Sequence, residues 1–99
     1  MAKRRPYVAE LNSQARRRVV AEVRRTQPRC AGCGLPIDLS LDAKRHALGS
    51  TVDENIPRSH GGSAVDMGNL LHMHRRCNSI KGSRRLTPEV QAELESDDE

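Results

Sequence analysis

Two pairs of metal-ligand residues, each with two residues between its members, constrain the fold of this chain more than any other feature. The first pair is Cys30 and Cys33, and the second pair, far along the chain, is His74 and Cys77. Three thiolates and one imidazole make the closed set of nitrogen and sulfur ligands that a tetrahedral structural zinc ion takes in proteins. The spacing therefore predicts one zinc site formed by all four residues, rather than unrelated buried thiols and an exposed imidazole.

The composition favours such a cross-link, because the chain has little apolar bulk from which to build a core. Its 99 residues are enough for one domain, and they include no Phe, no Trp and a single Tyr, Tyr7. Small domains with thin cores commonly depend on a disulfide or a metal for their stability. Three cysteines cannot all pair with one another, and the basic start of the chain lacks the apolar run of a secretory signal. We therefore expect zinc, in a reducing and cytoplasmic setting.

Charge is distributed unevenly along the chain, although the net charge is only +4. Residues 1–29 hold nine basic side chains against Glu10 and Glu22, whereas residues 89–99 hold six acidic side chains and no basic one. An arginine-rich front end attracts a nucleic-acid backbone, although a solvated helix face is the alternative. The acidic end either aids solubility or competes with nucleic acid for the arginines. No segment approaches the roughly 20 apolar residues that cross a bilayer, so no membrane partner is expected.

The two ends of the chain are expected to differ in structure. Residues 1–7 are predicted to form a disordered basic arm, and residues 8–25 an amphipathic helix, because apolar side chains recur there at every fourth position. The apolar positions are Leu11, Ala15, Val19 and Val23. At the other end, Thr87 as a cap and Pro88 in the first turn favour a short acidic helix and tail over residues 87–99.

Extended segments and loops are expected between the ligand pairs. Residues 37–41 alternate apolar with polar side chains, as a short half-buried strand or an extended loop would. Residues 42–50 are expected to form a connecting loop, and residues 51–54 a second strand. The Gly61 and Gly62 pair then requires a loop, because glycine permits backbone angles that other residues avoid.

A short helix is expected to carry the second ligand pair. Residues 69–73 lead into this helix, which is predicted over residues 75–84. His74, just before the helix, and Cys77 are one turn apart, so both can face one metal. Asn78 then points about a quarter-turn away, toward a different site.

Four blocks of residues occur in a fixed order along the chain. The blocks are Cys30-x-x-Cys33-Gly34, Val52-Asp53-x-x-Ile56-Pro57-x-Ser59-x-Gly61-Gly62, Asn69-Leu70 and His74-x-x-Cys77-Asn78-x-x-Lys81-Gly82. With these blocks, residues 15–85 resemble the HNH endonucleases of the ββα-metal fold, in particular the small free-standing enzymes of bacteriophages and prophages. The resemblance implies an α+β fold, with a small zinc-stapled ββα-metal domain over residues 8–86 that includes an N-terminal amphipathic basic helix.

The resemblance also implies a second metal site, for Mg²⁺ or Mn²⁺, with Asp53 and Asn78 as oxygen ligands. Asn69 is expected to brace the loop that carries the catalytic base, through hydrogen bonds to the backbone. The base of this family is usually His, but Glu54 stands at that position. A free Glu carboxyl has a pKa about two units below that of His. Glu54 is therefore a weaker base, an extra metal ligand, or the mark of a site kept only for binding.

The implied activity is hydrolysis of phosphodiester bonds in DNA by a divalent-metal-dependent endonuclease or nickase, with the phage terminase or portal as a further partner. The alternative is a noncatalytic, zinc-stapled module that binds DNA or the terminase. The charge layout disfavours a third possibility, a zinc-ribbon interaction protein without a nucleic-acid partner. His60 and His72 are candidates to replace the missing histidine base. The expected nucleic-acid contacts are Arg16, Arg17, Arg58, Lys81, Arg84 and Arg85.

Overall fold

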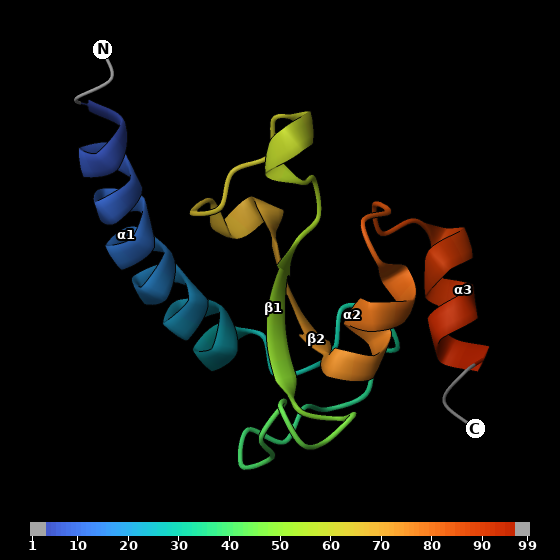
Figure 1. The fold of residues 1–99 in the computed structure, drawn as a ribbon. Helices are drawn as coiled ribbons and strands as arrows, with labels where there is room; N and C mark the ends of the chain where they lie inside the picture. Colours follow the sequence, from blue (N-terminus) through green and yellow to red (C-terminus); the bar gives the residue numbers. More distant parts are fainter. Residues whose placement is uncertain (1–3, 97–99) are drawn as a thin grey trace.

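The computed structural model describes residues 4–96 of the chain, and the side chains of residues 13–95. Its elements, in chain order, are α1 (Arg4–Thr26), β1 (Ser50–Glu54), the 3₁₀ helices η1 (Arg58–His60) and η2 (Met67–Asn69), β2 (Leu70–His74), α2 (Arg75–Lys81) and α3 (Pro88–Ser96). The two strands form an antiparallel sheet in the centre, with α1 on one side and α2 and α3 on the other (Figure 1). The expected α+β class is confirmed.

Helix α1 begins earlier than the sequence pattern predicts. Because it starts at Arg4, residues 4–7 are helical and not a disordered arm, while residues 1–3 of the predicted arm lie outside the described part of the chain. Pro6 is compatible with the first helical turn, since the first four backbone N–H groups of a helix have no partner within it.

The predicted apolar face of α1 packs against the sheet. Val23 is fully buried, Ala15 and Val19 are partly buried, and the side chain of Leu11 lies outside the described residues. Helix α1 is 23 residues long, but no helix in the described part of the chain combines the length and the apolar character needed to span a membrane.

Of the two alternatives for residues 37–41, the strand is wrong and the loop is correct, because the partner of β1 comes from β2. Residues 37–41 turn instead, since the Asp38 carboxylate accepts hydrogen bonds from the Ser40 backbone N–H at 2.9 Å and from the Ser40 hydroxyl at 2.7 Å. In β2, four of five residues are buried, so the strand lacks the alternation that reveals a half-buried strand. The predicted strand at residues 51–54 is confirmed as β1.

The two C-terminal helices lie close to their predicted positions. Helix α2 ends at Lys81, earlier than the predicted residue 84, because Gly82 follows with a φ of +61°, which stops a helix. Helix α3 begins at Pro88 as predicted, and the Thr87 hydroxyl accepts a hydrogen bond from the Val90 N–H at 3.2 Å. Residues 97–99 of the predicted acidic tail lie outside the described part of the chain.

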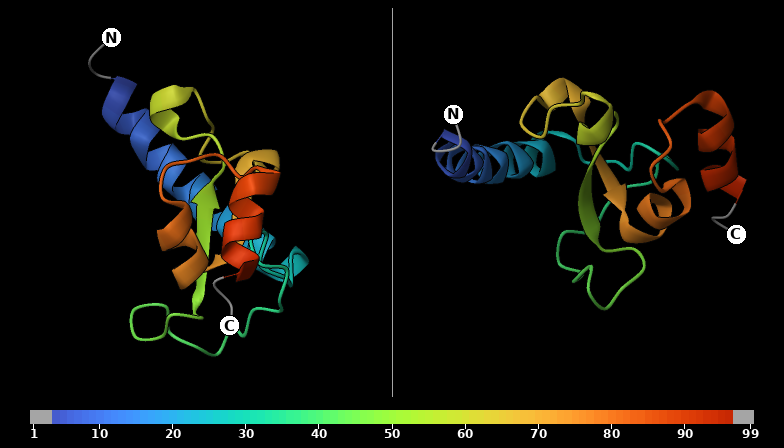
Figure 2. Two further views of the ribbon diagram at one scale, coloured as in Figure 1. Left: turned by 90° about the vertical axis from the view of Figure 1, so that its right-hand side faces the viewer. Right: turned by 45° about the horizontal axis from the view of Figure 1, so that its top comes forward.

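The core is built from cysteines and a few aliphatic side chains, and no described Phe, Tyr or Trp ring contributes to it. Its buried members are Cys30, Cys33, Ile37, Met73, Cys77, Val90 and Leu94. Helix α3 lies alongside α2 (Figure 2) and supplies Val90 and Leu94. The packing is close at Gly32, where an added Cβ atom would lie 2.4 Å from Leu94 Cδ1. The cysteine cluster and the apolar core are therefore one packed unit.

Candidate functional site

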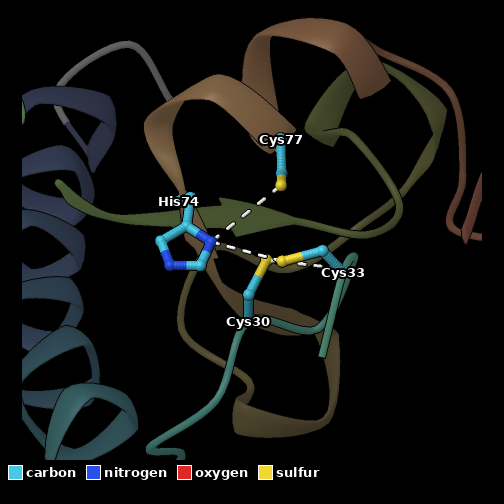
Figure 3. A group of neighbouring side chains, drawn as sticks. All are labelled: Cys30, Cys33, His74 and Cys77. Atoms are coloured by element: carbon cyan, nitrogen blue, oxygen red, sulfur yellow. Dashed lines mark hydrogen bonds between the residues drawn. The ribbon is translucent and has the colours of Figure 1, made fainter. Parts of the chain in front are cut away.

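The four predicted zinc ligands converge in the core from three parts of the chain. Cys30 and Cys33 lie in the turn after α1, His74 ends β2 and Cys77 lies in α2. Their ligand atoms are within 4.8 Å of one another, and all four side chains are buried. Figure 3 shows the three sulfur atoms gathered around His74 Nδ1, which is 3.4 Å from Cys33 Sγ and 4.0 Å from Cys77 Sγ. This group of three cysteines and one histidine could hold a structural metal ion such as zinc.

Hydrogen bonds outside the cluster orient its ligand atoms. The backbone N–H groups of Gly32 and Cys33 point at Cys30 Sγ from 3.3 and 3.5 Å and fix its position. On the other side, His74 Nε2 lies 3.1 Å from the carbonyl oxygen of Pro36. This carbonyl can only accept, so Nε2 carries the proton and Nδ1 presents its lone pair to the three sulfur atoms.

Two of the thiols are hard to ionise on their own. Burial raises the pKa of Cys33 and of Cys77, and the neighbouring Cys30 sulfur raises both further. A metal ion must displace these protons, because cysteine binds zinc as the thiolate. Zinc binding at this cluster is therefore expected to release protons and to strengthen as the pH rises.

A separate pocket contains the two residues predicted to hold a second metal. Asp53 lies on β1 and Asn78 lies on α2, and both line one pocket with a volume of about 370 Å³. The other lining residues are Glu54, Pro57, Gly82 and Ser83. The sheet and α2 thus bring a carboxylate and an amide, which are distant in the sequence, into one pocket.

Lys81 lies beside this pocket and is not available for the predicted phosphate contact. Its side chain is 1% exposed, and Nζ donates a hydrogen bond at 2.8 Å to Asp53 Oδ2. Lys81 lies one turn after Cys77, on the buried side of α2, whereas the prediction assumed a solvated helix end. That spacing is the sequence signal that could have revealed its burial.

Glu54, at the position expected for the catalytic base, lies between two guanidinium groups. Its side chain is 15% exposed, and Oε2 is 3.3 Å from Arg58 Nε and 3.6 Å from Arg16 Nη1. Arg16 also donates hydrogen bonds to the carbonyl oxygens of Ala64 at 2.9 Å and Val52 at 3.4 Å. Arg16 and Arg58, two of the five arginines predicted as nucleic-acid contacts, therefore lie at the candidate site, where they already pair with a carboxylate.

Asn69 makes the backbone hydrogen bonds that were expected of it. Its Oδ1 accepts from the Ile56 N–H at 2.8 Å, and its Nδ2 donates to the carbonyl oxygens of Ile56 at 3.0 Å and Ser63 at 2.9 Å. The loop that it braces is tight at Gly62, where an added Cβ atom would lie 1.6 Å from the Ile56 oxygen. This loop follows directly after Glu54, so Asn69 holds the chain next to the candidate base.

Neither histidine that could have replaced the base lines the pocket. His72 is buried, with Nε2 at 2.7 Å from Ser50 Oγ and Nδ1 at 2.5 Å from the Gln27 carbonyl oxygen, and burial lowers its pKa. It joins the end of α1 to the sheet and has a structural role. His60 is exposed on η1 and is not among the residues that line the pocket.

The remaining predicted contacts lie on α1 and in the segment after α2. Arg17 and Arg85 are exposed. Arg84 is bound to Glu93 of α3, with Nη1 at 3.0 Å from Oε2 and Nη2 at 3.1 Å from Oε1. Sequence reasoning did not find this pairing, because it depends on how α3 folds back beside α2.

One face of α1 forms a further pocket, with a volume of about 500 Å³. Its lining residues are Ser13, Arg16, Arg17, Val20, Ala21 and Arg24. Arg24 was not among the predicted contacts, although its spacing of eight residues from Arg16 puts both on one helix face. Arg16, Arg17 and Arg24 make this the arginine face of α1. Because Arg16 reaches from it to Glu54, the arginine face adjoins the pocket that contains Asp53.

Comparisons with known proteins gave no relative, since no family model, no curated protein and no solved structure matches this chain.

Proposed function

We propose that this protein is a divalent-metal-dependent DNA endonuclease or nickase of the HNH type, stapled by a structural zinc ion. The observation that carries the proposal is the shared pocket of Asp53 and Asn78. The Cys3His cluster supports it further, because Cys77 directly precedes Asn78 on α2 and thereby fixes where the amide lies. The order of the sequence blocks and the brace formed by Asn69 agree with the same class of enzyme.

The residues of the pocket fit a partly hydrated divalent ion. Asp53 Oδ2 already accepts a hydrogen bond from Lys81 Nζ. Oδ1 is therefore the carboxylate oxygen that would bind the ion, together with the Asn78 amide oxygen. Mg²⁺ typically takes one or two protein oxygens and keeps several waters or phosphate oxygens. An ion held there would neutralise charge that develops on the phosphate and would activate a water molecule.

Glu54 and the two arginines that contact it would position the phosphate and move a proton. Arg16 and Arg58 carry guanidinium groups, which match the geometry of phosphate oxygens. Both contact Glu54 through Oε2, so Oε1 is the oxygen that would accept a proton from the attacking water. Base catalysis of this kind typically contributes about 10²–10⁴ in rate. The arginine face of α1 would bind the DNA backbone next to the pocket. A part in phage genome packaging, beside the terminase or portal, belongs to the proposal through the family resemblance alone.

Plasmid nicking tests the proposal. Zinc-loaded protein is incubated with supercoiled plasmid and Mg²⁺, Mn²⁺ or a chelator of low zinc affinity, and the open-circular product is measured. We expect metal-dependent nicking that Asp53→Asn and Asn78→Ala both abolish. Asp42→Asn is the matched control, since it changes an exposed carboxyl in the loop before β1 and should leave nicking unchanged.

The second candidate function is a noncatalytic module that binds DNA. It is favoured by a specific observation, namely that Asp53 and Glu54 each already pair with cations of the protein. Intact plasmid at every metal concentration, together with salt-sensitive binding in a gel shift, would support the module over the enzyme. Glu54→His separates the two further, because a rate increase identifies Glu54 as a weak base at a working site.

A further inference from the structure

Lys81 is the most unusual residue of the candidate active site, because lysine is almost never fully buried unless it is paired. Its ammonium group donates to Asp53 Oδ2 at 2.8 Å and to the Gly82 carbonyl oxygen at 3.4 Å. Its partner is therefore the same carboxylate that would bind the divalent ion. One oxygen of that carboxylate is already neutralised by a cation of the protein itself.

The charges around the pocket do not favour the binding of a divalent cation in addition to the ammonium group of Lys81. Besides Asp53, the pocket is lined by the carboxylate of Glu54, which faces Arg16 at 3.6 Å and Arg58 at 3.3 Å. Two carboxylates thus stand against one ammonium and two guanidinium groups. A divalent ion at Asp53 would be repelled by Lys81 and would find no uncompensated negative charge to attract it.

We propose that Lys81 is the resident counterion of Asp53 and that it keeps the affinity of the free protein for a divalent ion low. The inference rests on the divalent-ion site of the proposed function and adds the residue that sets its affinity. Lys81 acts through Asp53, so it is a positioning residue. Its buried ammonium is held in place by the packing of α2 against β1.

Titration of zinc-loaded protein with Mn²⁺ tests this role, with free Mn²⁺ measured by its electron paramagnetic resonance signal. The wild-type protein is expected to bind Mn²⁺ weakly, because Lys81 already compensates the charge of Asp53. Lys81→Met, which removes the charge at similar side-chain length, is expected to bind at least about tenfold more tightly. Lys44→Met is the matched control, because it removes the same charge from an exposed loop before β1 and should leave the Kd unchanged. Adding Asp53→Asn to Lys81→Met should remove the gain, since no carboxylate then remains at residue 53.

Unchanged or weaker Mn²⁺ binding by Lys81→Met would overturn the proposal, and so would wild-type binding in the low micromolar range. If circular dichroism and zinc content show that Lys81→Met does not fold, Lys81→Gln takes its place, because it keeps a hydrogen-bond donor without the charge. The readout needs no DNA cleavage. If Lys81→Met binds Mn²⁺ more tightly but the wild-type protein does not nick plasmid, this inference is sustained and the proposed enzyme is contradicted. If the wild-type protein nicks plasmid but Lys81→Met has an unchanged Mn²⁺ affinity, this inference alone is overturned.

Discussion

The two asparagines of the candidate site have different tasks, and substitution can separate them. Asn69 is buried and makes three hydrogen bonds to the backbone of Ile56 and Ser63, so Asn69→Ala leaves several buried polar groups without partners. We expect this change to lower the free energy of unfolding by about 2–4 kcal/mol. Asn78 is only partly buried and lines the pocket, so Asn78→Ala should change stability by less than about 0.5 kcal/mol while it abolishes nicking.

Urea unfolding followed by circular dichroism, run beside the plasmid assay, measures both effects. A loss of stability in Asn78→Ala as large as that in Asn69→Ala would show that Asn78 is a structural residue. In that case, the loss of nicking could not be assigned to a missing metal ligand.

The contact between the segment after α2 and helix α3 is a surface ion pair with a measurable pH signature. The two-pronged hydrogen bond from Arg84 lowers the pKa of Glu93. Because the folded pKa lies below the unfolded one, the stabilisation is complete above the unfolded pKa and is lost as the pH falls through the folded one. An NMR titration of the wild-type protein should give Glu93 a pKa below the ordinary value for Glu. Arg84→Gln should return this pKa to its ordinary range, whereas Arg85→Gln, which changes an exposed neighbour, should not.

The elements that carry local signals could be predicted from the sequence, and those defined by distant partners could not. The Thr87 cap and the start of α3 follow from local chemistry, as does the strand at residues 51–54. Strand β2 was missed because helices and the cysteine turn cover it, so its burial leaves no alternating pattern. Residues 37–41 show such a pattern, but the Asp38 side chain turns the backbone away from a strand.

The same division holds for the candidate site. The spacing of the ligand pairs identifies the Cys3His cluster, because two closely spaced pairs of soft ligands are typical of a structural zinc site. The roles of Lys81 and Arg84 depend on where β1 and α3 lie relative to α2. Charge alone suggests solvent or phosphate as the partner of such residues, and only the tertiary fold identifies the carboxylates that they bind.

At the scale of the whole molecule, the Cys3His cluster and the candidate active site are both built on the sheet and α2. His74 ends β2, whose residue Leu71 lies opposite Asp53 in the sheet, and Cys77 directly precedes Asn78 on α2. A metal that holds His74 and Cys77 together therefore also holds the sheet against α2. The protein has few other means of doing so, because its buried core contains aliphatic residues and cysteines but no described Phe, Tyr or Trp ring.

Removal of the metal should consequently unfold the domain and separate the residues that line the pocket. Structural zinc in small domains contributes about 10–16 kcal/mol of apparent binding free energy, which is as large as the whole net stability of a typical domain, about 5–15 kcal/mol. We expect one zinc per chain by metal analysis, and loss of the dispersed amide NMR spectrum after chelation under reducing conditions. Acid should have the same effect, because burial raises the pKa of Cys33 and Cys77 and protons then compete with zinc.

Cys77→Ser should reproduce the loss of the dispersed amide spectrum, and Ser79→Ala, an exposed change on the same helix, should not. A metal-free protein that keeps its dispersed spectrum would show that the apolar core is sufficient, and that α2 and the sheet hold Asp53 and Asn78 together without help from the cluster.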